Sequence, residues 1–483
     1  MSKLKITAKE LRVIGYPESP VIPVAMDAIG KHYKHNKKEV VMEILKAVLA
    51  SPIEYKNDAV LGMIAEKLLP KEALSDPEIS LNTIGAHFNT FGTEHIEQGA
   101  FHQMYSAVKL PVAIAGALMP DAHHGYGLPI GGVLATDNAV IPYGVGVDIG
   151  CRMCLSIFDI AAKELTNKEQ FFARAIGEAT LFGSGAQFKQ AEDHEIMENE
   201  AFFKMPLLRG LHARAWKQLG SSGSGNHFVE FGIVTITEKD AILGIAPGTY
   251  VGLLSHSGSR ALGANIAQYY TKVAISKRRL PQEAKNLAWL NLNEEAGHEY
   301  WIAMNLAGDY ASACHHIIHT KIAKQLGRKP ITMVENHHNF AWKEIYEGRE
   351  VIVHRKGATP AGKNVLGIIP GSMTADGFIV KGKGESASIY SASHGAGRKM
   401  SRTQALGNIT YNALQDELQK HGVKLLGGGL DEAPFAYKDI NAVMRSQSAL
   451  VDVVGKFTPK IVKMCGDAPR QERNRKSNTI EGE

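Results

Sequence analysis

The segment Ser391–Arg398, with the sequence Ser-Ala-Ser-His-Gly-Ala-Gly-Arg, places a histidine on an unusually bare backbone. Gly395 and Gly397 can adopt positive φ, and without a Cβ they let a ligand approach the main chain closely. Imidazole is a nucleophile, and the arginine could pair with a phosphate. Taken alone, the segment is more typical of a glycine-rich turn with a solvated histidine than of a phosphate site with His394 as its nucleophile, and the rest of the chain decides between the two.

Side chains of metal-ligand type occur at or near the ends of several expected strands. The candidates are Asp148, Cys151, His227, His256 and one of the adjacent residues His337 and His338. Asp148 and Cys151 are three residues apart, and a bend at Gly150 could bring both to one centre. Five ligands of mixed oxygen, sulfur and nitrogen type suit one or two divalent ions with open positions, and thiolate with imidazole favours zinc. Cys151-x-x-Cys154 has no second Cys-x-x-Cys to complete a structural zinc site.

Two further glycine-rich loops adjoin expected strands. In Met119–Gly127, the side chains of Asp121, His123 and His124 could be metal ligands or partners of ligands, and a purely structural turn is an equal alternative. In Gly220–Phe231, strand alternation places Asn226 and Glu230 on one face and His227 on the other. An amide and a carboxylate together offer the donors and acceptors that a ribose or a base edge requires.

The elements that must position these residues indicate a mixed α/β fold. The pattern combines many short apolar strands with long alanine-rich helical stretches, and it lacks a βαβ nucleotide-binding fingerprint. We expect residues 1–95 to form a helical, peripheral region, residues 96–466 to form the catalytic domain, and residues 467–483 to form a disordered tail. Helical periodicity over 292–326 makes His315, His316 and His319 packing or surface residues.

Composition limits the class of protein. The chain has 483 residues, a net charge of +5 and a sequence pI near 8.7, which permits a polyanionic partner without requiring one. Its four cysteines suggest a reducing compartment without a disulfide framework. It shows no secretory signal pattern and no apolar run of the roughly 20 residues that span a bilayer. We therefore expect a cytoplasmic protein with no membrane partner.

Nine motifs in the same order between Met119 and Asp439 resemble the RtcB family of RNA ligases. That family depends on GTP and manganese, and it joins a 3′-phosphate or 2′,3′-cyclic phosphate end of RNA to a 5′-hydroxyl end. The motifs are Met-Pro-Asp-x-His-x-Gly-x-Gly (119–127), Val-Asp-Ile-Gly-Cys (147–151), Gly-Asn-His-Phe-x-Glu (225–230), His-Ser-Gly-Ser-Arg (256–260), His-Asn (338–339), His-Arg-Lys-Gly-Ala-Thr (354–359), Pro-Gly-Ser-Met (370–373), Ser-x-x-His-Gly-Ala-Gly-Arg (391–398) and Ala-Tyr-Lys-Asp (436–439).

The resemblance implies a role for each matching position. His394 would be the histidine that becomes guanylylated on the way to an activated RNA-3′-pp-5′-G end. The manganese ligands, for two Mn(II) ions, would be Asp148, Cys151, His227, His256 and His338, which selects His338 over His337. The residues that hold GMP would be Asn226, Glu230, Asn339, Pro370, Gly371, Ser372, Met373, Gly395, Ala396, Gly397 and Tyr437. The implied fold is RtcB-like, with a β-sandwich-like core and surrounding helices, and the implied setting is RNA repair or tRNA splicing.

The chain departs from the family pattern at three places. Arg152 stands where the family has glycine, the Met373–Gly377 loop differs, and a terminal lysine–glycine has Lys463 as its nearest counterpart. These departures keep two alternatives open. One is a metal-dependent phosphoesterase that processes RNA ends without joining them, and the other is a non-catalytic RNA-binding protein.

Overall fold

Apolar residues at helical spacing form a bundle in the N-terminal part of the chain. The helices are α1 (Ala8–Val13), α2 (Val21–His32), α3 (Lys38–Ala50) and α4 (Gly62–Leu68). Their inward faces share a core that includes Leu11, Ile29 and Leu45. Thr7 and Glu10 form a capping box that satisfies the first backbone donors of α1.

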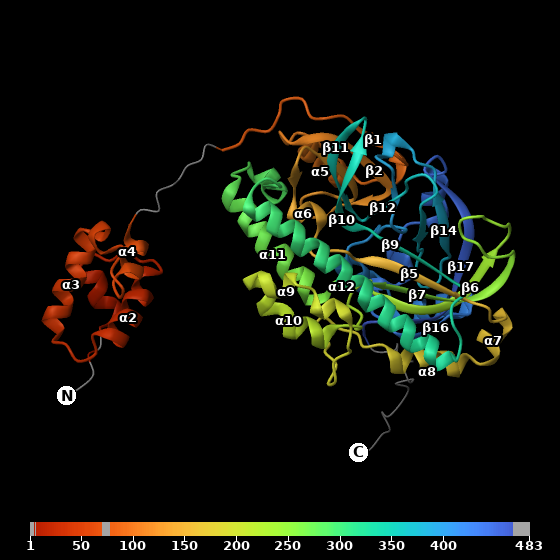
Figure 1. Cartoon of the computed structure of the whole chain (residues 1–483), viewed down its shortest axis with the longest axis horizontal. Coiled ribbons are helices and arrows are strands. Elements are labelled where there is room, and N and C mark those ends of the chain that lie inside the picture. The colour runs from red at the N-terminus through yellow and green to blue at the C-terminus, as the bar shows by residue number, and fades with distance from the viewer. Residues whose placement is uncertain (1–3, 5, 70–77, 467–483) are drawn as a thin grey trace, which may run out of the picture. The chain divides into compact units, whose positions relative to one another are not determined.

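The computed structural model describes residues 4, 6–69 and 78–466. It divides the chain into two units, Met1–Glu78 and Ile79–Glu483, each with its own core (Figure 1). The tail expected at 467–483 lies outside the described residues. The sequence placed the start of the catalytic domain at residue 96, and that domain boundary stays a prediction.

An eight-stranded sheet forms the centre of the second unit and carries most of the candidate ligands. Its strands, in spatial order, are β13 (Leu366–Ile369), β14 (Gly377–Gly382), β17 (Val451–Met464), β6 (Phe228–Ile236), β7 (Gly248–Ser257), β5 (Arg152–Phe158) and β9 (Thr332–His337), with β16 (Lys424–Gly427) paired beside β17. Asn336 on one edge strand donates to the carbonyl oxygen of Ile368 on the other (3.3 Å) and accepts from its N–H (2.8 Å). The sheet therefore nearly closes on itself.

A second sheet of five strands adjoins the first and supplies the segment around Asp121. Its order is β1 (Phe88–Thr90), β2 (Ala113–His123), β3 (Ile130–Thr136), β11 (Arg349–Lys356) and β10 (Asn339–Tyr346). Two short ribbons pair β12 (Ala358–Pro360) with β15 (Ser391–Ser393), and β4 (Ala139–Val140) with β8 (Leu290–Asn291). The first ribbon leads directly into His394.

Helices cover the outer side of the eight-stranded sheet (Figure 1). The long α12 (Glu295–Leu326) packs Ile318 and Ile322 against Val251 and Leu253 of β7, together with Phe172 of α8. The other helices of this unit are α5 (Gln98–Val108), α6 (Pro142–Val145), α7 (Ala162–Asn167), α8 (Glu169–Ala179), α9 (Ala201–Lys204), α10 (Pro206–Gln218), α11 (Arg260–Lys277), α13 (Arg402–Asn408), α14 (Tyr411–His421) and α15 (Ile440–Ser446). None of the helices in the described ranges is long and apolar enough to cross a membrane.

Strand alternation gives the sheet two apolar faces. Met153, Leu155 and Leu254 point into the space enclosed by the sheet and meet Phe457 there. Intervening residues such as Cys154 and Ser156 point the other way, toward α12. The mixed α/β class predicted from the sequence is confirmed.

Candidate active site

Four adjacent strands of the large sheet bring four of the predicted metal ligands together at the same end of the strands. His227 precedes β6, His256 lies near the end of β7, Cys151 precedes β5, and His338 follows β9. Gly150 adopts a left-handed conformation (φ 70°), which is the bend that the sequence required between Asp148 and Cys151. A side chain there is also excluded, because its Cβ would lie 2.7 Å from the Cα of Gly308.

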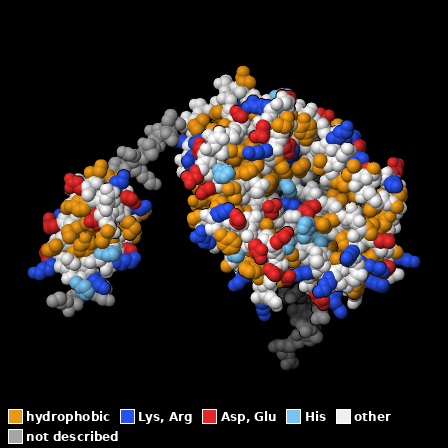
Figure 2. Space-filling view, viewed as in Figure 1, with side chains coloured by type: hydrophobic (Ala, Val, Ile, Leu, Met, Phe, Trp, Pro, Cys, Tyr) orange, Lys and Arg blue, Asp and Glu red, His pale blue; other side chains and the backbone are white. Residues whose placement is uncertain are grey.

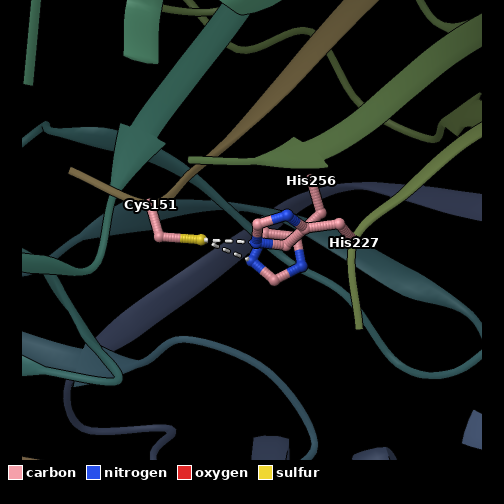
Figure 3. A group of neighbouring side chains, drawn as sticks. All are labelled: Cys151, His227 and His256. Carbon is pink, nitrogen blue, oxygen red and sulfur yellow. Dashed lines mark hydrogen bonds between the residues drawn. The ribbon is translucent and has the colours of Figure 1, made fainter. Parts of the chain in front are cut away.

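The donor atoms of these residues converge closely. The Cys151 Sγ lies 3.4 Å from the Nε2 of His227 and 3.2 Å from the Nε2 of His256 (Figure 3). The His227 Nε2 also lies 2.9 Å from an Asp148 carboxylate oxygen, and the His256 Nε2 lies 3.1 Å from the Nε2 of His338. All five predicted ligands are therefore linked through short distances between donor atoms.

The protonation states suit a bound cation. The Nδ1–H of His256 donates to the carbonyl oxygen of Asn226 (3.0 Å), which leaves the Nε2 lone pair aimed at the other ligands. Burial lowers the pKa of His256 to about 3, so the ring is neutral. Burial works to raise the pKa of Asp148, but the hydrogen bond and charge of His227 outweigh it and hold the pKa at about 2. Burial and the Asp148 charge raise the pKa of the Cys151 thiol, and a cation would reverse that shift.

The spacing of the donor atoms fits a metal. Ligands in a tetrahedral site with bonds of about 2.0–2.3 Å are roughly 3.3–3.8 Å apart. The 3.1–3.4 Å distances among Cys151, His227, His256 and His338 are close to that range. The buried Nδ1 atoms of His227 and His338 have no hydrogen-bond partner among the described residues, so the polar contacts of these two rings are made through Nε2. The residues present could hold one or two divalent ions.

His394 is held by a residue whose role the sequence left open. The buried carboxylate of Asp121, near the end of β2, accepts a hydrogen bond from His394 Nδ1 (2.6 Å) and another from the His394 backbone N–H (3.2 Å). The proton on Nδ1 leaves Nε2 as the nucleophilic nitrogen. Burial opposes ionisation of Asp121, but the hydrogen bond from His394 keeps its pKa below the usual value. The ring of His338 lies 4.9 Å from that of His394, so His394 adjoins the metal ligands.

A cavity of about 330 Å³ opens beside His394. That volume lies at the lower end of the usual range for small-molecule sites. The predicted nucleotide residues that line it are Asn226, Glu230, Pro370, Gly371, Ser372, Met373, Gly395, Ala396, Gly397 and Tyr437. His256 and His338 also reach its wall, so the cavity and the ligand set share a boundary.

Some predicted residues lie elsewhere. Asn339 does not line the cavity, because its side chain accepts from the N–H of Gly357 (2.8 Å) and faces the carbonyl oxygen of Asp148 (3.4 Å). His337 stacks on Trp342, with ring centres 4.9 Å apart, and so points away from the ligands. Lys463 lies with its ammonium 3.3 Å from the Gly177 carbonyl oxygen, outside the cavity lining.

Several residues of the site carried no clear signal in the sequence. The cavity has an apolar floor that comes from strands far apart in the chain and includes Met153, Leu254, Phe457, Val462 and Met464. Glu432 is buried beside Tyr437 and accepts its phenolic hydrogen, while the guanidinium of Arg398 lies 5.3 Å from the ring centre. Only the neighbouring motifs, Ala436–Asp439 and Ser391–Arg398, could have pointed to this cluster.

A second buried group of ligand type lies on the α12 side of the sheet and consists of Cys154, His315 and His319. The ring nitrogens of the two histidines already have partners. His319 contacts Ser156 (2.7 Å) and Ser255 (2.8 Å), and His315 contacts Ser255 (2.6 Å) and the Ser257 carbonyl oxygen (3.2 Å). This satisfied network agrees with the packing role predicted for the histidines of α12.

Fold and site together define a class: mixed α/β proteins in which a buried cluster of side chains that could hold a metal adjoins a cavity with a carboxylate-held histidine. The family model of tRNA-splicing ligase RtcB matches residues 103–464, and the chain belongs to that family. It is similar to the RNA-splicing ligase RtcB of Escherichia coli K12 (34% identity over 391 residues, 74% of this chain and 92% of the relative). It is also similar to RtcB1 of Escherichia coli ATCC 25922 (32% over 392 residues, 74% and 92%) and to the tRNA-splicing ligase RtcB of Methanococcus maripaludis (32% over 423 residues, 72% and 88%).

Proposed function

We propose that this protein is an RNA ligase that uses GTP and Mn²⁺ to join a 3′-phosphate or 2′,3′-cyclic phosphate end to a 5′-hydroxyl end. The observation that carries the proposal is the Asp121–His394 pair at the wall of the cavity, beside the convergent ligands. Family membership and the names of the relatives support RNA as the substrate. The reaction would serve RNA repair or tRNA splicing.

The first step would be attack on GTP by His394. Its Nε2 lone pair forms a bond to the α-phosphorus, the bond from that phosphorus to the bridging oxygen breaks, and pyrophosphate leaves. The imidazole gains positive charge as this bond forms, and the Asp121 carboxylate 2.6 Å from Nδ1 stabilises it. Bound Mn²⁺ would supply Lewis-acid stabilisation of the phosphate oxygens, and Asp148, Cys151, His227, His256 and His338 would hold it.

The later steps would move the nucleotide to RNA and then release it. An oxygen of the RNA 3′-phosphate attacks the phosphorus of the His394 adduct, and the imidazole leaves, which gives the RNA-3′-pp-5′-G end. The 5′-hydroxyl then attacks the RNA phosphate, loses its proton, and expels GMP. A 2′,3′-cyclic phosphate would first be hydrolysed to the 3′-phosphate.

The cavity residues support a nucleotide as the co-substrate. Gly395, Ala396 and Gly397 line the cavity beside His394 with small side chains or none. Gly397 also packs closely on Asp121, since a Cβ there would come within 2.2 Å of the Asp121 carbonyl oxygen. Asn226 offers an amide and Glu230 a carboxyl group to the base or ribose, and Tyr437 offers a ring for stacking. Burial raises the pKa of Glu230 well above its usual value, so its carboxyl group can also donate a hydrogen bond.

We place the protein in the cytoplasm. All four cysteines are unpaired among the described residues, and a reducing compartment such as the cytoplasm keeps thiols in that state.

The test is covalent labelling of the protein with radiolabelled GTP and Mn²⁺ in the absence of RNA. We expect an adduct that is stable to base and labile to acid, as phosphoramidates are, and that is absent from His394→Ala. Failure of the wild-type protein to form an adduct with any of several divalent metals would reject the proposal.

A second candidate is a metal-dependent phosphoesterase that opens cyclic phosphate ends without joining them. The observations that favour it are the position of Lys463 outside the cavity and the presence of the divergent residues Ala375 and Gly377 in its wall. End processing that needs no nucleotide and persists undiminished in His394→Ala would support this candidate against the ligase.

A further inference from the structure

The N-terminal unit lies outside the region that defines the family. The family model begins at residue 103, whereas Met1–Glu78 forms a unit with an apolar core of its own. The matches to the E. coli relatives cover 74% of this chain. The activity proposed for the second unit therefore gives no account of what this helical unit does.

One end of this unit carries a concentrated positive charge. The connection between α2 and α3, together with the helix residues that flank it, reads Lys-His-Tyr-Lys-His-Asn-Lys-Lys over 31–38, and we call this segment the basic loop. It holds four lysines and two histidines and no acidic residue. All of its side chains except half-buried Tyr33 are exposed, and Figure 2 shows Lys and His side chains together at the lower end of the unit.

Two of these lysines have an evident structural partner and two do not. Lys31 pairs with Asp27 (2.7 Å), and Lys38 pairs with Glu10 (2.5 Å). Lys34 and Lys37 have no carboxylate within ion-pair distance among the described residues, and both are exposed. The loop therefore presents two uncompensated cations beside two partly compensated ones.

Helix stability does not account for the cations at the start of α3. Lys37 is the residue that caps this helix, and it makes no side-chain hydrogen bond to the first backbone donors. A cation at a helix N-terminus is also unfavourable because it faces the positive end of the helix dipole. By contrast, α1 in the same unit begins with a favourable threonine–glutamate capping box. Glu39 in the first turn offsets part of this effect, so helix stability favours an acid here and gives no reason for Lys37 and Lys38.

We propose that the basic loop binds the sugar-phosphate backbone of the RNA substrate. The identity of the polyanion rests on the proposed ligase function, and the loop supplies the complementary charge on exposed, flexible lysine side chains. Phosphate contacts of this kind carry no sequence information but supply much of the affinity for nucleic acid. Because the loop and the catalytic unit belong to one chain, RNA held by the loop would be present at a raised effective concentration for the site.

The expected effect can be worked from counterion release. Each phosphate contact to single-stranded nucleic acid changes the slope of log K against log salt by about 0.7, so each contact contributes roughly 5-fold in affinity at 0.1 M salt. Reversing the charge of the two unpaired lysines in Lys34→Glu/Lys37→Glu should therefore weaken RNA binding by at least roughly 25-fold and reduce the salt slope by about 1.4.

The experiment measures binding of the full-length protein to a fluorescein-labelled single-stranded RNA, by fluorescence anisotropy over a series of salt concentrations. The matched control is Lys56→Glu/Lys67→Glu, which makes the same change in net charge at two exposed lysines of the same unit, outside the loop. We expect the control to bind within about 3-fold of wild type. A milder variant, Lys34→Gln/Lys37→Gln, removes the cations without adding acids and should show an intermediate loss, which guards against misfolding of the charge-reversed protein.

The outcomes separate this proposal from the proposed function. Guanylylation without RNA should proceed at the wild-type rate in the loop variants, so loss of RNA affinity with normal adduct formation supports the loop as an RNA-binding element. Equal weakening in loop and control variants would overturn the proposal, and so would wild-type affinity in the loop variants. Anionic lipid vesicles that compete with RNA for the loop at the same concentration of phosphate groups would indicate a membrane surface as the partner. That result would also overturn the proposal. If the wild-type protein formed no adduct yet the loop variants lost RNA affinity, the ligase function would fail and the RNA-binding loop would stand.

Discussion

Replacing Asp121 should slow the formation of the His394 adduct while leaving metal and nucleotide binding intact. Asp121 is fully buried, and one of its carboxylate oxygens accepts from both Nδ1 and the backbone N–H of His394, at 2.6 and 3.2 Å. In Asp121→Asn, these two donors select the amide oxygen for the same position, because the amide nitrogen would meet a hydrogen there. The asparagine therefore keeps the tautomer of His394 and removes only the negative charge.

The two effects of Asp121 can be separated by a pair of variants. A hydrogen bond to a charged group contributes about 1.5–3 kcal/mol, against roughly 0.5–1.5 kcal/mol for a neutral one. Loss of charge alone in Asp121→Asn should thus cost roughly 1–2 kcal/mol, or about 5- to 30-fold in rate. Asp121→Ala also releases the ring and its tautomer, so its rate should fall further, by about 10²-fold or more.

The assay is single-turnover labelling with radiolabelled GTP and Mn²⁺ in the absence of RNA, with the affinity for GTP and the bound metal measured in parallel. We expect the rate order wild type, then Asp121→Asn, then Asp121→Ala, at unchanged GTP affinity. The other oxygen of Asp121 has no hydrogen-bond partner among the described residues, so the asparagine amide disrupts no existing bond. Adduct formation at the wild-type rate in Asp121→Ala would refute the reasoning, and loss of rate only in parallel with loss of GTP affinity would reduce Asp121 to a structural residue.

Three further results are expected. Cys151→Ser should lose the thiolate-to-metal charge-transfer band of the Co²⁺-loaded protein and bind Mn²⁺ more weakly, whereas His394→Ala should keep the band; a band that survives in Cys151→Ser would place the thiolate outside the metal site. Tyr437→Ala should raise the KM for GTP about 5- to 160-fold, since stacking contributes roughly 1–3 kcal/mol per base. Tyr437→Phe should raise it little, and equal effects of the two changes would exclude stacking as the role of the ring. Burial lowers the pKa of His315 and His319 to about 3. Because an unfolded histidine titrates near 6.5, the unfolded chain takes up protons first as pH falls, and each residue should lower the unfolding free energy by about 2 kcal/mol at pH 5. Urea unfolding of EDTA-treated protein at neutral and acid pH measures this decrease in the unfolding free energy. The decrease should be smaller in His319→Gln than in the wild-type protein. An equal decrease in the two proteins would show that the His319 ring is already solvated.

The convergence of the five side chains was readable from the sequence because most of them adjoin a strand, and strand parity is a local property. Two adjacent histidines must point to opposite sides of a strand, so only one of His337 and His338 could join a common centre. In the structure, His338 reaches His256, whereas His337 stacks on Trp342. The bend at Gly150 was likewise readable, since only glycine adopts a positive φ there without cost.

Pairings between distant segments could not be predicted in the same way. Asp121 and His394 are 273 residues apart, and they meet because the end of β2 packs beside the ribbon of β12 and β15. That packing depends on the register of two sheets and on the apolar residues between them, which no local pattern encodes. The same reason explains why Asp121 appeared in the sequence only as one of several polar residues in a glycine-rich loop.

The residues that depart from the family pattern differ in whether they line the cavity. Arg152 follows the ligand Cys151, yet its side chain turns to the opposite face of β5, where it pairs with Glu335 and donates to the carbonyl oxygen of Gly308 (2.8 Å). It therefore replaces a glycine without entering the cavity. Ala375 and Gly377 do enter its wall, beside the apolar floor formed by Phe457 and its neighbours. The same wall carries the polar side chains of Asn226, Glu230 and Ser372, so the polar groups that could discriminate among ligands lie outside these two changed positions. We therefore expect any effect of these departures on ligand binding to come from the Met373–Gly377 loop rather than from Arg152.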